Sequence, residues 1–245
     1  MAVEGEEEGR VGTDLISVNL SYNSLVASDI MSLAGNYELD TIETLKLGFN
    51  NLRDLGSNIV MSSFRNSKSL TCLDLGFNGI TDIGAKHIGK FLEKNSSLKI
   101  LYLSGNSLTR IGFDYMGKSL KKNKHLEALY LTGNTAGEQG AKAFFESLES
   151  NNSLRKVYVA GNKICGTGCS SIAAALITNR TLTHLNLSDN DIGDYGADYL
   201  SQTLLQNREM KVLMLSFNKI SSFGIHKLCQ SFQGYSGLEK LLLNR

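Results

Sequence analysis

The feature that most constrains this chain is an asparagine that returns at a nearly constant interval along its 245 residues. The first gap is 27 residues, and the six gaps that follow are 28 residues each. A regular period of this length indicates a repeat architecture, in which each copy is one small unit that packs on its neighbours. The recurring residues are Asn23, Asn50, Asn78, Asn106, Asn134, Asn162, Asn190 and Asn218.

Apolar residues occupy fixed positions before each of these asparagines, as in "LKILYLSGNSL" at 98–108. The alternation in L-x-L has period 2, so it predicts a short strand that sends its leucines inward and the intervening residues outward. The asparagine follows where the chain must turn without proline, of which the sequence has none. Its short amide can bond neighbouring backbone groups inside an apolar stack, so we interpret it as structural.

A glycine and a second asparagine bound the other half of each copy. Between them, apolar residues fall three and four apart, as Ala85, Ile88 and Leu92 do, which predicts a helix with one apolar stripe. We expect the second asparagine to end the helix in the left-handed conformation. The glycines are Gly56, Gly84, Gly112, Gly140, Gly168, Gly196 and Gly224, and the asparagines are Asn95, Asn123, Asn151, Asn179 and Asn207.

Such a unit cannot bury its own apolar face, so the copies must stack, with the strands in one parallel sheet and the helices on its other side. Strands lie about 4.8 Å apart whereas packed helices need about 10 Å. This mismatch bends the stack. We therefore expect an α/β solenoid shaped like a horseshoe, with the parallel sheet on the concave side and the helices on the convex side.

The pattern resembles that of leucine-rich repeat proteins of the ribonuclease-inhibitor-like subfamily, over roughly residues 15–245. The 28-residue copies with a full helix are similar to those of the sensing regions of NOD-like receptors. Ribonuclease inhibitor itself alternates two repeat lengths and is rich in cysteine, whereas this chain keeps one length and has four cysteines. The resemblance implies binding of a protein partner on the concave surface.

The ends of the chain differ from its middle. We expect residues 1–12, "MAVEGEEEGRVG", to be a disordered acidic leader. Residues 13–245 then form a single leucine-rich repeat domain of eight repeats plus a partial ninth. The last copy stops after its strand without a polar cap, which terminal repeats normally have. The chain is therefore either a fragment or a solenoid whose edge is covered by something else, and self-association through this uncapped C-terminal repeat is one way to cover it.

Composition and motifs favour neither catalysis nor binding of nucleic acid or membranes. The formal net charge is +1, from 25 basic and 24 acidic residues, and no apolar run is long enough to span a bilayer. No nucleophile beside a base, paired carboxylates, metal-ligand spacing or phosphate loop stands out, so we expect no enzyme and no cofactor. The four cysteines lack paired spacing, and with no secretory signal they indicate a reduced, cytoplasmic protein. Seven lysines on two adjacent predicted helices are interpreted as a solvated face.

The outward strand positions are where copies can differ. Tyr102, Tyr130 and Tyr158 take the same outward position in three consecutive copies, and glycine precedes the marker asparagine in those copies alone. We expect this glycine to leave the rings accessible. Exposed tyrosine is enriched in interfaces, which favours a binding patch centred on Tyr130. The predicted protein-binding residues are Tyr102, Tyr130, Tyr158, Phe77, Phe49, His184, Asn186, Asp74 and Lys156.

Two alternatives remain open. Tyrosine also suits a sheet surface, where neighbouring rings stabilise each other across strands, and duplication of one repeat would copy it. For function, the first hypothesis is a non-catalytic scaffold or sensor that binds a protein partner of unknown identity. The second is a GTPase-activating protein similar to the Ran activators, in which Arg53 or Arg110 in a loop after a strand would assist a bound GTPase.

Overall fold

The computed structural model describes residues 15–36, 39–232 and 237–244. The predicted leader, residues 1–12, lies outside this part of the chain. Within it, nine short strands alternate with eight helices. The strands are β1 (Ser17–Asn19), β2 (Thr44–Lys46), β3 (Cys72–Asp74), β4 (Ile100–Tyr102), β5 (Ala128–Tyr130), β6 (Lys156–Tyr158), β7 (His184–Asn186), β8 (Val212–Met214) and β9 (Lys240–Leu242). The helices are α1 (Ala27–Asn36), α2 (Arg53–Ser63), α3 (Asp82–Leu92), α4 (Arg110–Lys122), α5 (Gly137–Leu148), α6 (Cys165–Thr178), α7 (Gly193–Leu204) and α8 (Ser222–Phe232).

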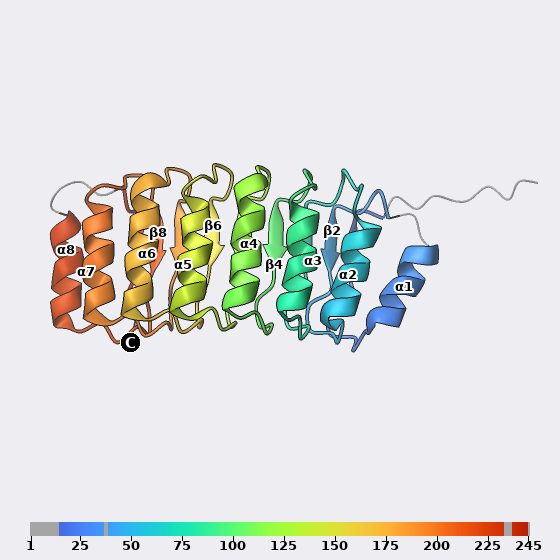
Figure 1. The fold of residues 1–245 in the computed structure, drawn as a ribbon, viewed down its shortest axis with the longest axis horizontal. Coiled ribbons are helices and arrows are strands. Elements are labelled where there is room, and N and C mark those ends of the chain that lie inside the picture. Colours follow the sequence, from blue (N-terminus) through green and yellow to red (C-terminus); the bar gives the residue numbers. More distant parts are fainter. Residues whose placement is uncertain (1–14, 37–38, 233–236, 245) are drawn as a thin grey trace, which may run out of the picture.

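All these strands form one parallel sheet in the order of the sequence. From β2 onwards, each residue pairs with the residue 28 positions later, as Leu73 does with Leu101. The helices stand side by side in one row on a single face of the sheet (Figure 1). The predicted α/β solenoid is therefore confirmed. We call the face of the sheet without helices the open sheet face; it is the face that the sequence predicts to be concave.

The core lies between the sheet and the row of helices. Leu73, Leu101 and Leu129 are the middle residues of successive strands, and each is 0% exposed. Full burial of one leucine stabilises a fold by about 1.5–3 kcal/mol. Because each strand contributes one such residue to a continuous column, every repeat depends on its neighbours for burial.

The marker asparagines bind the backbone of two consecutive repeats. Asn106 Nδ2 donates to the carbonyl oxygens of Leu103, in its own repeat, and of Leu75, in the preceding one, each at 3.0 Å. Its Oδ1 accepts from the backbone N–H groups of Asn78 and Ile80, also at 3.0 Å. Equivalent bonds recur at Asn50, Asn78, Asn134, Asn162, Asn190 and Asn218. The structural role predicted for these side chains is thereby explained.

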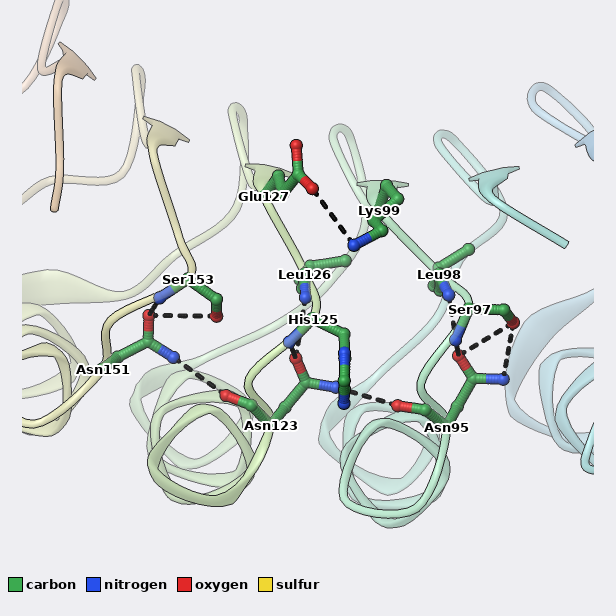
Figure 2. A network of polar contacts seen from close by, with 10 residues as sticks. All are labelled: Asn95, Ser97, Leu98, Lys99, Asn123, His125, Leu126, Glu127, Asn151 and Ser153. Carbon is green, nitrogen blue, oxygen red and sulfur yellow. Dashed lines mark hydrogen bonds and ion pairs between the residues drawn. The ribbon is translucent and has the colours of Figure 1, made fainter. Parts of the chain in front are cut away.

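The second set of asparagines forms a ladder at the helix ends (Figure 2). Asn123 Nδ2 donates to the carbonyl oxygens of Leu92 at 2.7 Å and Asn95 at 3.2 Å, while its Oδ1 accepts from the backbone of His125 and Leu126 at 2.9 and 2.8 Å. The prediction of a left-handed conformation was wrong, because Asn123 has φ −70° and ψ 130°. The extended backbone directs the amide across to the previous repeat, where it satisfies buried carbonyls.

Carboxylates connect some repeats at the helix starts. Asp82 Oδ1 accepts from the backbone N–H groups of Thr109 and Gly112 at 2.8 Å, and Oδ2 accepts from Thr109 Oγ1 at 2.6 Å. Asp54 with Thr81 and Asp194 with Ser221 repeat this arrangement. A Cβ on Gly112 would lie 2.6 Å from Asp82 Oδ1, so the carboxylate needs the glycine.

Candidate protein-binding surface

Three tyrosine rings form one stack on the open sheet face. Tyr102, Tyr130 and Tyr158 are paired in the strand register. The ring centroids of Tyr102 and Tyr130 are 4.2 Å apart with planes at 17°, and those of Tyr130 and Tyr158 are 4.4 Å apart with planes at 7°. Both faces of Tyr130 are thus covered by its neighbours, and all three side chains are partly buried. The rings are less accessible than the sequence suggested, because stacking covers both faces of Tyr130 and one face each of Tyr102 and Tyr158.

The tyrosine hydroxyls stay neutral at ordinary pH. Burial, followed by interactions with neighbouring ionisable groups, raises the pKa of Tyr102, Tyr130 and Tyr158 above the usual value of 10.0. A neutral phenol both donates and accepts hydrogen bonds. The stack therefore offers an apolar ridge edged with three hydroxyl groups.

A second aromatic stack lies where the strands turn towards the helices. Tyr22 and Phe49 have ring centroids 4.3 Å apart, and Phe49 and Phe77 have centroids 4.2 Å apart, with planes within 12° in both pairs. These rings are 72%, 43% and 48% exposed. Sequence reasoning assigned Phe49 and Phe77 to the surface but omitted Tyr22. The signal was available, because all three precede a marker asparagine.

The residue before each marker asparagine is held in the left-handed backbone region. Phe77 has φ 54°, and Gly105, Gly133 and Gly161 have φ 66°, 69° and 63°. The glycines thus have a local conformational reason that the sequence did not reveal, since only glycine adopts this region freely. Phe77 adds a second reason, because a Cβ on Gly105 would collide with its ring.

Asp74 lies in the same repeat as Phe77, and the next repeat carries Tyr102. It pairs with Tyr102 in the register, and its Oδ1 accepts from the backbone N–H of Gly76 at 2.8 Å. A Cβ on Gly48 would lie 3.0 Å from Asp74 Oδ2, so the carboxylate turns towards the preceding repeat. Burial raises the pKa of Asp74, while the Gly76 hydrogen bond and Lys46 oppose that shift.

The remaining predicted residues lie on β6 and β7. Lys156 pairs with His184, and Tyr158 pairs with Asn186. Burial lowers the pKa of His184 below 6.5, and the charge of Lys156 lowers it further. Asn186 Oδ1 accepts from the Ser188 backbone at 3.0 Å. The register therefore places the nine predicted residues on the open sheet face or its turn edge, from the second repeat to the seventh.

The two arginines of the alternative hypothesis begin helices and do not lie in the loops where the sequence placed them. Arg53 and Arg110 are the first residues of α2 and α4, and α3 stands between those helices (Figure 1).

Across residues 15–36, 39–232 and 237–244, no group of three or more histidine, cysteine, aspartate or glutamate residues is arranged to hold a metal ion. None of the helices described is both long and apolar enough to cross a membrane.

Comparisons with known proteins agree with this architecture. A Leucine Rich repeat family model matches residues 66–89, 122–145, 150–173 and 178–201, and a second Leucine Rich Repeat model matches residues 97–118. A search of curated proteins found no match. Among solved structures, the chain is similar to Leiomodin-1 Actin-Binding Site 2, with a TM-score of 0.52 and 20% identity over 69% of this chain and 90% of that one. Identity this low shows a shared fold alone. The matched stretches between residues 66 and 201 are thus leucine-rich repeats, and they lie within one solenoid of parallel strands and helices.

Proposed function

We propose that this protein is a non-catalytic scaffold or sensor module that holds a partner protein on its open, concave sheet face. The observation that carries the proposal is the tyrosine stack of Tyr102, Tyr130 and Tyr158 in three adjacent strands of that face. Rigid aromatic side chains supply a large contact area at a small cost in conformational entropy. The predicted residues Phe49, Phe77, Asp74, Lys156, His184 and Asn186 extend this surface on both sides.

The comparisons support binding as the general activity. Leucine-rich repeat domains generally mediate protein–protein interactions and are typically not enzymes. The similar solved structure is an actin-binding site of leiomodin-1, and actin binding is a property of that protein. The 28-residue register and the helix after each of the first eight strands support the finer placement in the ribonuclease-inhibitor-like subfamily.

Location and assembly are part of the same proposal. Cys72, Cys165, Cys169 and Cys229 are all free thiols, as expected in the reducing cytoplasm. We also propose self-association through the C-terminal repeat, where Leu241 and Leu243 of the last strand region are only partly buried. Sedimentation velocity over a range of concentrations measures this directly, and a constant monomer would exclude it.

Affinity capture from native cell lysate tests the binding surface. The variant Tyr102→Ser, Tyr130→Ser, Tyr158→Ser removes the tyrosine stack. Thr132→Arg is a second variant that leaves the rings in place and adds a bulky charge two residues after Tyr130. The matched control is Tyr195→Ser, Phe223→Ser, which removes two aromatic rings that are 85% and 60% exposed on α7 and α8.

We expect a protein that the wild type and the control capture and that both sheet-face variants lose. Circular dichroism and thermal unfolding must show that each variant is folded. Equal capture by folded sheet-face variants would place the interface elsewhere and would refute the proposal.

A further inference from the structure

We propose that the empty side-chain positions at Gly133 and Gly161 form a slot for an arginine side chain of the partner, whose guanidinium lies between the Phe77 ring and the Asp189 carboxylate. This inference deepens the proposed function and rests on it for the statement that the partner is a protein. It commits to one kind of contacting group, and it can be tested without knowing the partner.

The slot comes from a single column of residues, those that precede the marker asparagines. Side chains fill the column at Tyr22, Phe49 and Phe77, are missing at Gly105, Gly133 and Gly161, and return at Asp189 and Phe217. Backbone hydrogen bonds from Gly105 to Thr132 and from Gly133 to Ala160, both 2.8 Å, hold the three glycines in register. The gap therefore has a fixed floor of backbone.

Two side chains lean into this gap from its ends. Phe77 occupies the space beside Gly105 where a side chain would begin. At the other end, Asp189 Oδ2 lies 3.5 Å from the position of a Cβ on Gly161. In between, a Cβ on Gly133 would meet only the backbone of Gly105, at 3.6 and 3.8 Å. Among the residues that the structure describes, none places a side chain in the middle position.

The length of the gap suits a planar cation. Adjacent repeats are about 4.8 Å apart along the sheet, so the two steps from Gly105 to Gly161 cover about 10 Å. A guanidinium stacked on a ring at about 4 Å and hydrogen-bonded to a carboxylate at about 3 Å fills most of that length. Arginine fits better than lysine, because its planar group stacks on aromatic faces and pairs with a carboxylate through two parallel hydrogen bonds.

The charge in the slot has no partner within the described residues. Asp189 is exposed, and no ion pair that involves it is found there within 4.0 Å. The nearby cation Lys219 pairs instead with Asp191. Lys219 interacts with Asp191 through a hydrogen bond and through charge, whereas its interaction with Asp189 is electrostatic only and weaker. A cation from a partner would therefore neutralise a carboxylate that the chain itself leaves unpaired.

The test uses the peptide acetyl-Ala-Arg-Ala-amide and its citrulline analogue, which is nearly isosteric and neutral. Titration of the ¹⁵N-labelled protein should shift the amide signals of Gly133, Gly161 and Asp189 with the arginine peptide. We expect the citrulline peptide to bind at least about 10-fold more weakly, a difference of about 1.4 kcal/mol. Equal shifts with both peptides, or shifts confined to other residues, would overturn the proposal.

Two variants assign the site. Asp189→Asn keeps the shape and tolerates the left-handed backbone, so it should abolish the preference for arginine over citrulline. Its matched control, Asp191→Asn, changes the neighbouring carboxylate and should keep that preference. Gly133→Phe, Gly161→Phe should close the slot, and the fold accepts phenylalanine at this turn because Phe49, Phe77 and Phe217 have φ 58°, 54° and 58°. Retained peptide binding in the closed variant would also refute the slot.

The two proposals fail in different ways. A negative peptide titration with normal loss of capture in the tyrosine variants would remove the arginine slot and leave the binding module. Arginine-specific shifts at Gly133 and Gly161 with unchanged capture in those variants would establish the slot and refute the tyrosine surface.

Discussion

The ring of Phe77 occupies the space that a side chain on Gly105 would need, although the two residues are 28 positions apart. Gly105→Ala should therefore be more destabilising than Gly133→Ala, where the added methyl group meets only backbone at 3.6 Å. In both variants the left-handed backbone of the new alanine lowers the free energy of unfolding by about 1–2 kcal/mol. The collision with Phe77 adds a loss of about 1 kcal/mol at Gly105. Urea unfolding measures the difference. Equal losses would show that the Phe77 ring moves aside freely.

The middle ring of the tyrosine stack should matter most for stability. Tyr130→Ser breaks two ring contacts, whereas Tyr158→Ser breaks one. A stacked pair contributes about 0.5–1.5 kcal/mol beyond the area that it buries, so Tyr130→Ser should lower the free energy of unfolding by about that much more. Chemical denaturation of both variants is the comparison. Identical losses would mean that stacking of the rings adds no measurable stability.

Ionisation of these tyrosines should unfold the surface at high pH. Their pKa values are raised in the folded protein, mainly by burial, so the neutral rings contribute stability that is fully present below the unfolded pKa near 10. That contribution is lost as the pH rises through the higher folded values. Absorbance at 295 nm and unfolding curves taken above pH 10 should change together. The triple serine variant should lack this part of the alkaline loss.

The asparagine ladder predicts that Asn123→Asp lowers the stability of the protein by an amount that depends on pH. Asn123→Asp would replace the amide that donates to Leu92 and Asn95 with a carboxylate facing the same two carbonyl oxygens. Burial and these oxygens should raise the folded pKa of the new carboxyl group above the unfolded value of about 3.9. The variant should therefore be more stable at pH 4 than at pH 7, relative to the wild type at each pH. A defect that is the same at both would contradict a buried, bridging amide.

Thiol reactivity should separate two neighbouring cysteines. Burial raises the pKa of Cys169 to about 12, and this side chain is 0% exposed, whereas Cys165 is exposed. Since the thiolate is the reactive form, iodoacetamide should modify Cys165 in the native protein and reach Cys169 only after unfolding. Peptide mapping after timed labelling distinguishes the two sites. Equal rates would indicate that α6 opens readily.

Much of the fold could be predicted because each repeat obeys local rules. The period-2 leucines fixed the direction of residues such as Leu101 and Tyr102, and the absence of proline assigned the turns to asparagine. Cys169 takes the position that Ala141 and Ala197 hold in the adjacent repeats, which indicates a small buried side chain, and it is 0% exposed. Each of these inferences needs only a residue's near neighbours in the sequence or its equivalents in other repeats.

Other features depended on contacts between repeats, which local reasoning does not reach. The left-handed conformation was predicted for Asn123, which is extended, and missed at Phe77, which adopts it. The Asp82–Thr109 link was missed although its signal, an aspartate and a hydroxyl residue 27 positions apart, occurs three times. For the surface, the sequence located the tyrosines but could not show that stacking covers both faces of Tyr130.

The asparagine bonds between repeats have a consequence for how the solenoid comes apart. Asn123 and Asn151 each donate to backbone carbonyls of the repeat before them. Each bond is therefore lost when either of its two repeats detaches, and a central repeat loses such bonds on both sides. Fraying should accordingly begin at the outermost described repeats, so that their amide protons exchange with solvent before those of the central repeats.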